Sequence, residues 1–71
     1  MNNYRQTEII SYSAKITSGK KRIECPLEEV SVICNSQEDE IRFVNETREN
    51  LQKEFPKATE IEIYPSLRYK K

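Results

Sequence analysis

The stretch Asn35–Pro56, with the sequence NSQEDEIRFVNETRENLQKEFP, decides the fold, because it combines a helical apolar period with stop signals at both ends. Asn35 and Ser36 are residue types that cap helix N-termini, and three acids follow in the first turn, where the helix dipole favours negative charge. Pro56 cannot continue the backbone hydrogen bonds and displaces Phe55 from helical geometry. The sequence therefore predicts one helix over about residues 36–55.

One face of this helix is predicted to lie on a sheet. At about 100° per residue, an apolar stripe about 80° wide is formed by Ile41, Val44, Leu51 and Phe55. Arg48 falls in the middle of this stripe, and Phe43 points away from it. We interpret Arg48 either as a side chain whose stem crosses apolar surface or as a group that holds a carboxylate or a partner. Phe43 is interpreted either as a scattered surface aromatic or as an anchor in a protein contact.

The residues before the helix predict a β-hairpin. Apolar and polar residues alternate up to Thr17, a Ser18-Gly19 pair is typical of a turn, and the alternation resumes at Ile23. With Ser18 and Gly19 as the two loop residues, every apolar residue faces another: Ala14 lies opposite Ile23, Tyr12 opposite Cys25, and Ile10 opposite Leu27. The same register puts Lys15 opposite Arg22, which is an unfavourable like-charge pair.

Two further strands are predicted, one on each side of the helix. Pro26 has no donor for a ladder and is expected to end or edge the second strand, so Val30–Cys34 is a third strand and Glu60–Tyr64 a fourth, closed by Pro65. A strand, a helix and a strand of these lengths indicate a right-handed crossover with the two strands parallel. The expected fold class is α+β: a single domain over residues 1–71 with a small mixed sheet of about four strands in the order βββαβ. One amphipathic helix packs on one face, and residues 1–3 and 66–71 are expected to be flexible.

The second face of such a sheet is expected to be mostly wet. Ile9, Ile33 and Tyr64 fall on the outward parity, however, and together they would form an apolar patch that favours a homodimer or another partner. The alternative is that strand ends or a bulge return one or two of them to the core.

Composition excludes several classes of chemistry. The 71 residues include no histidine, one glycine and two cysteines. A zinc site, a histidine-based catalytic set and a glycine-rich phosphate loop are therefore excluded, and we expect a non-enzyme without metal or cofactor. Cys25 and Cys34 are predicted to be buried thiols in a reducing compartment, with a bridge between neighbouring strands as the alternative. A polar N-terminus and the lack of a long apolar run predict a soluble, cytoplasmic protein.

Three hypotheses about function follow. The preferred one is a small protein-binding module, a regulator or inhibitor of the kind that phages and mobile elements encode, acting through an acidic helix face or a sheet edge. Its candidate residues are Phe43, Glu46, Arg48 and Glu49. A nucleic-acid-binding protein is the first alternative, although the formal net charge is zero. Its basic hairpin tip and C-terminal arm contain Lys15, Lys20, Lys21, Arg22, Arg68, Lys70 and Lys71. The second alternative is a homo-oligomeric structural protein.

Overall fold

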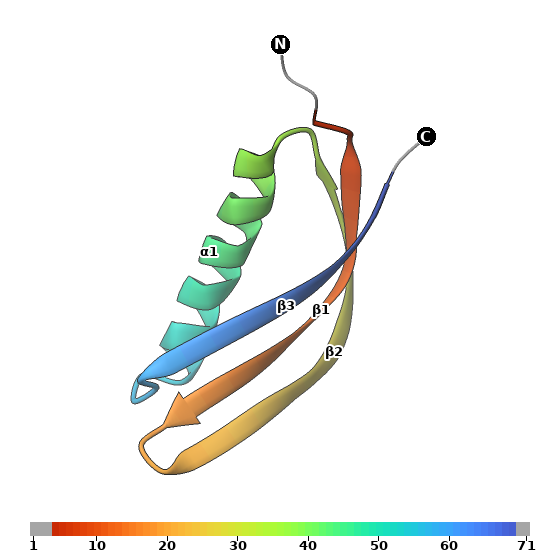
Figure 1. Ribbon diagram of the computed structural model, residues 1–71. Helices are drawn as coiled ribbons and strands as arrows, with labels where there is room; N and C mark the ends of the chain where they lie inside the picture. The colour runs from red at the N-terminus through yellow and green to blue at the C-terminus, as the bar shows by residue number, and fades with distance from the viewer. Residues whose placement is uncertain (1–3, 70–71) are drawn as a thin grey trace.

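Over residues 4–69, which the computed structural model describes, the chain forms a three-stranded sheet and one helix (Figure 1). The elements are β1 (Thr7–Ser18), β2 (Lys21–Cys34), α1 (Gln37–Glu54) and β3 (Glu60–Tyr69). The strand order is β2-β1-β3, and both outer strands pair antiparallel to β1. The α+β class and the single helix over one face of a sheet agree with the sequence prediction.

The predicted count of about four strands is wrong, because the expected second and third strands are one continuous strand, β2. Pro26 is tolerated there because β2 lies at an edge of the sheet. Two bulges absorb the irregular residues of β2. In each of them one residue of β1 lies opposite two of β2: Ser13 opposite Pro26 and Leu27, and Ile10 opposite Val30 and Ser31.

The predicted crossover is correct in direction and wrong in pairing. Because β2 and β3 are each antiparallel to β1, they run the same way, as expected for strands joined through α1. They do not pair with each other, since β1 lies between them. The sheet is therefore purely antiparallel rather than mixed.

The hairpin turn lies one residue later than predicted. Ser18 pairs with Lys21, so Gly19 and Lys20 form the loop, and Gly19 adopts a φ of 62°, which a glycine accepts without strain. The register consequently shifts by two residues, which keeps apolar pairs near the turn: Ile16 lies opposite Ile23 and Ala14 opposite Cys25. Beyond them the predicted pairs are wrong, because the first bulge puts Tyr12 opposite Glu28 and leaves Leu27 64% exposed.

This shift changes the neighbours of Lys15 on the outer face. Lys15 lies opposite Glu24 on β2 and Glu62 on β3, so the predicted like-charge pair with Arg22 is wrong. Arg22 faces Thr17 instead. A cation between two acids is a favourable cross-strand arrangement.

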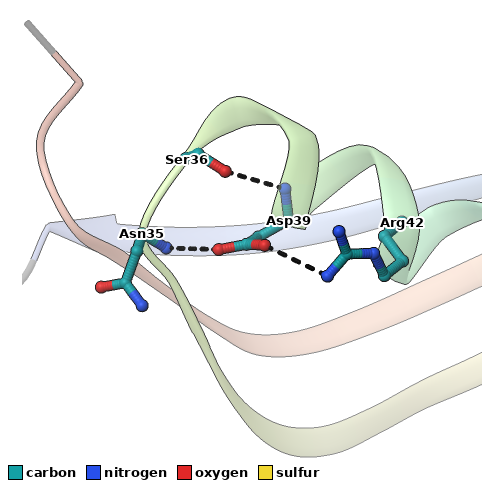
Figure 2. A network of polar contacts seen from close by, with 4 residues as sticks. All are labelled: Asn35, Ser36, Asp39 and Arg42. Atoms are coloured by element: carbon teal, nitrogen blue, oxygen red, sulfur yellow. Dashed lines mark hydrogen bonds and ion pairs between the residues drawn. The ribbon is translucent and has the colours of Figure 1, made fainter. Parts of the chain in front are cut away.

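The helix agrees with its predicted bounds, and a polar network fixes its first turn (Figure 2). Ser36 is the N-cap, and its Oγ accepts a hydrogen bond from the backbone N–H of Asp39 at 3.3 Å. The Asp39 carboxylate in turn accepts the backbone N–H of Asn35 at 2.9 Å and lies 3.4 Å from an Arg42 nitrogen. At the other end, the N–H of Phe55 bonds to the carbonyl of Leu51 at 2.8 Å. Both ends of α1 therefore satisfy backbone groups that a bare helix would leave open.

The face of α1 that meets the sheet is centred on Thr47, which is 8% exposed. Val44, Leu51 and Phe55 are half-buried, as predicted, but Ile41 is 53% exposed. Phe43 occupies the buried side in its place. The predicted stripe was therefore rotated away from the true one, because the centre of the true face carries a polar residue.

The core is small. Among the described residues its buried apolar side chains are Ile9, Ala14, Ile16, Cys34 and Ile61. Ile9 is fully buried because the bulge beside Ile10 turns it inward, which removes it from the predicted outer patch. Ile33 and Tyr64, each 43% exposed, lie on opposite edge strands, beside Glu8 and Ser13 of β1 respectively. The predicted patch of three residues therefore does not form.

The C-terminal residues extend the sheet. Pro65 pairs with Tyr12 and does not close the strand, because β3 is an edge strand and continues to Tyr69. Residues 66–69 thus belong to β3, where the sequence predicted a flexible arm. The predictions for residues 1–3, Lys70 and Lys71 fall outside the described residues.

Both cysteines are free and lie on the same strand; Cys34 is buried, as predicted, whereas Cys25 is half-buried. They are nine residues apart along β2, or about 30 Å, so the alternative of a bridge between neighbouring strands is wrong. Burial raises the pKa of the Cys34 thiol, and the nearby Glu40 and Asp39 raise it further. Cys34 is therefore a protonated core residue. Within residues 4–69, no helix has both the length and the apolar character needed to cross a membrane.

Candidate functional site

The outward side of α1 carries a shallow hollow that is lined by three acids, one arginine, one asparagine and one isoleucine. Its apolar side chain is Ile41, which lies at one margin, and we call the whole surface the acidic helix face. The face consists of Glu38, Ile41, Arg42, Asn45, Glu46 and Glu49. Because Ile41 is 53% exposed, an apolar side chain that a partner could bury lies beside three carboxylates.

The predicted partner residues divide between this face and other places. Glu46 and Glu49 are exposed on it, as the sequence suggested. Phe43 is not on it: the Phe43 ring packs edge-on against Tyr12 of β1, with ring centroids 5.7 Å apart and planes at 74°. The basis for treating Phe43 as an exposed anchor is therefore wrong, and the exposed apolar position of the helix belongs to Ile41.

Arg48 connects α1 to the edge of the sheet. Its Nε donates to the backbone carbonyl of Ile61 on β3 at 3.4 Å, and an Nη donates to Asn45 at 3.2 Å. Although the side chain is exposed, it is oriented by two acceptors. The first interpretation of Arg48, a side chain lying across the sheet, is thus closer to the structure than a group that holds a carboxylate.

The basic residues of the nucleic-acid hypothesis are not brought together. Lys20, Lys21 and Arg22 are exposed at the hairpin tip. Arg68 lies at the other end of the sheet beside Glu8, ten residues of β1 away from Ser18, or about 33 Å.

Lys15 is also separated from a common basic surface. It lies between two acids, and its ammonium is 5.8 Å from the ring centroid of Tyr64. The described part of the chain therefore offers three clustered cations at the tip rather than a basic stripe.

A buried carboxylate on the outer face was missed by the sequence analysis. Glu8 is 6% exposed, and its carboxylate accepts from Arg68 Nη2 at 2.8 Å, from Arg68 Nε at 3.0 Å and from Ser31 Oγ at 2.8 Å. These contacts join β1 to both edge strands. The correct register of β3 on β1 would have revealed the pair, but the prediction ended β3 before Arg68.

Tyr12 joins the inner face of the sheet to the acidic side of β2. Its hydroxyl donates to the Glu28 carboxylate at 2.7 Å. This hydrogen bond, together with burial and the negative charge of Glu28, raises the pKa of Tyr12 from 10.0 to about 12. Loss of the phenol proton would remove the bond and place two negative charges side by side.

We expect the stabilising effect of this pair to be complete below about pH 10 and to be lost as the pH rises towards 12, because the folded state binds the proton more tightly than the unfolded state. Ultraviolet absorbance of tyrosinate during a pH titration should show a late component that Tyr12→Phe removes. Glu28→Gln should move that component to lower pH, since it removes the negative charge. A Tyr12→Phe variant with an unchanged titration curve would contradict the assignment.

The described residues contain no group of three or more His, Cys, Asp or Glu side chains placed to hold a metal ion. Comparisons with protein-family models, with curated proteins and with solved structures found no match to this chain.

Proposed function

We propose that this chain is a small, non-enzymatic protein-binding module, a regulator or inhibitor, that binds a basic surface of its partner through the acidic helix face. The observation that carries the proposal is the exposure of Ile41, 53%, beside Glu38, Glu46 and Glu49 on one side of α1. Protein interfaces combine buried apolar side chains with polar and charged ones. Because Ile41 is already about half-buried, its full burial would contribute about half of the roughly 1.5–3 kcal/mol of a fully exposed side chain, and the neighbouring charges accelerate encounter with a partner of opposite sign.

The face is held rigidly, which favours recognition. The cap network of Ser36 and Asp39 fixes one end of α1, and the Arg48 bond to Ile61 and the Phe43 contact with Tyr12 fix its seat on the sheet. A preorganised helix loses little conformational entropy on binding. The partner expected is therefore a protein with a cationic groove that accepts one aliphatic side chain.

The test is capture from cell extract with variants that resolve the surface. Glu46→Lys with Glu49→Lys, and separately Ile41→Asp, should abolish capture of a partner that the native chain retains. The matched control, Lys20→Glu with Lys21→Glu, reverses the same number of charges at the hairpin tip and should leave capture intact. Capture should also weaken with salt. Retention of the partner by both helix variants would refute the proposal. Loss of the partner with the hairpin variant alone would also refute it, and would favour the nucleic-acid hypothesis, which uses the hairpin tip.

A further inference from the structure

The two edges of the sheet differ in how they are protected against pairing with another strand. The edge strand β2 contains Pro26, two bulges and the acids Glu28 and Glu29, which are features that discourage strand addition. On β3, the carbonyl of Ile61 already accepts a hydrogen bond from Arg48, and Pro65 in the middle of the strand has no N–H to donate. Beyond Pro65, the segment Ser66–Tyr69 contains no proline and no acid.

The backbone of this segment has hydrogen-bonding groups on the unpaired side of β3. The N–H and C=O groups of successive residues in a strand point to alternate sides, so those of Leu67 and Tyr69 point to the same side as those of Ile61. The carbonyl of Ile61 faces Arg48 rather than β1. The N–H and C=O groups of Leu67 and Tyr69 therefore point away from β1. Arg68, between them, pairs with Glu8 of β1.

The side chains at this end are largely exposed. Leu67 is 39% exposed and Tyr69 is 65% exposed, on the same face as α1, with the Arg5 guanidinium carbon 4.7 Å from the centroid of the Tyr69 ring. An 18-residue helix is about 27 Å long, whereas the 12 residues of β1 extend about 40 Å, so one helix cannot cover the whole face. Figure 1 shows the C-terminal half of β3 running away from α1.

The chain exposes more surface than a compact protein of its mass. The chain exposes 5633 Å², whereas a compact protein of 8.4 kDa exposes about 4600 Å². The chain is also elongated, 44 × 22 × 16 Å, and an elongated body exposes more surface than a compact one of equal mass. The excess of about 1000 Å² is comparable with the roughly 800 Å² that each partner buries in a standard interface.

We propose that the end of β3 binds a second copy of this chain, with the two β3 strands pairing antiparallel about a two-fold axis at Leu67. In this register Leu67 lies opposite Leu67 of the partner subunit, and each Tyr69 N–H donates to the carbonyl of Pro65 of the partner subunit. The proline lacks a donor but keeps the acceptor that this register uses.

Self-pairing at this position is consistent with the charges. Ser66 faces Arg68 of the partner subunit, whereas an axis at Arg68 would bring two like charges together. The formal net charge of zero means that two copies do not repel each other at long range. An identical segment that pairs with itself without a clash is the requirement for a closed two-fold interface.

The test measures the mass of the full chain by sedimentation equilibrium over a range of concentrations. The native chain should be a dimer, and Leu67→Lys and Leu67→Pro should each weaken the dimer about ten- to hundredfold in dissociation constant. Leu67→Pro removes a donor from the free edge and leaves the β1–β3 ladder intact. The control is Leu27→Lys, which changes the 64% exposed leucine of β2 and should leave the dimer unchanged.

A native chain that stays monomeric at all concentrations would overturn the proposal, as would dimers that survive both Leu67 changes. Circular dichroism identifies a variant that fails to fold. If Leu67→Pro fails to fold, the dissociation constant of the Leu67→Lys dimer is the deciding measurement. Amide exchange at Leu67 and Tyr69, slow in concentrated and fast in dilute native protein, provides an independent readout. The Glu46 and Glu49 reversal should leave the dimer intact, so the two proposals can fail separately.

Discussion

Replacing Ile16 with alanine is expected to destabilise the protein by about 2–5 kcal/mol. Ile16 is 0% exposed and lies at the centre of the sheet, opposite Ile23 on β2 and Ile61 on β3. Removing this side chain opens a cavity on the central strand, between Ile23 and Ile61. Because β1 is hydrogen-bonded on both sides, the surrounding residues cannot move far to fill the cavity. Chemical denaturation followed by circular dichroism measures the effect.

The matched control is Ile33→Ala, also on a strand but 43% exposed, which should cost less than about 1 kcal/mol. A 71-residue protein has about 4–10 kcal/mol of total stability. The Ile16 variant should therefore be partly or wholly unfolded under conditions in which the native chain and the control variant are folded. All samples need one protein concentration, because dimerisation adds to apparent stability. Equal effects of the two substitutions would contradict the assigned core.

Local patterns in the sequence were sufficient for the elements of the fold. Alternation identified β1 and the first part of β2, and the cap residues at Ser36 and the stop at Pro56 bounded α1. These signals depend on neighbours close in sequence. They also kept the inner face of the hairpin correct from the turn to Ala14 and Cys25, because a shift of two residues keeps the side-chain parity up to the first bulge.

The features that the sequence did not reveal depend on which strands and helix lie next to each other in space. Proline is a stop signal in a central strand and harmless at an edge, so the continuity of β2 through Pro26 and of β3 through Pro65 follows from the strand order. The bulge that buries Ile9 likewise has no local signature beyond a break in alternation. The hydrogen bond from Arg48 to the Ile61 carbonyl can be predicted only when the position of α1 on the sheet is known.

The candidate site was half predictable for the same reason. Solvent exposure of Glu46 and Glu49 follows from their charge. The positions of Ile41 and Phe43 do not follow from the sequence: the two lie on opposite flanks of Val44, and the predicted stripe placed Ile41 towards the sheet and Phe43 away from it. The sheet decides between them: Tyr12 offers an aromatic edge contact to Phe43, and α1 leaves Ile41 outside.

Phe43→Ala is therefore expected to destabilise the fold by about 2–3 kcal/mol, below the usual cost for a fully buried phenylalanine because the ring is half-buried. Ile41→Ala should cost less than about 0.5 kcal/mol, since most of its side chain is already in water. The two substitutions lie two residues apart on the same helix, so helix propensity changes little between them. Denaturation midpoints of the two variants, compared with the native chain, measure the difference.

A double-mutant cycle locates the cause. The ring contact predicts a coupling of about 0.5–1.5 kcal/mol between Phe43→Ala and Tyr12→Ala, because an edge-to-face pair contributes beyond the area it buries. Tyr12→Phe keeps the ring and should retain most of the coupling. Well below its melting temperature, the Phe43 variant should still capture a partner that the Ile41→Asp variant loses. A neutral Phe43→Ala with no coupling to Tyr12 would instead place Phe43 at the surface, and Phe43 rather than Ile41 would then be the apolar anchor for a partner.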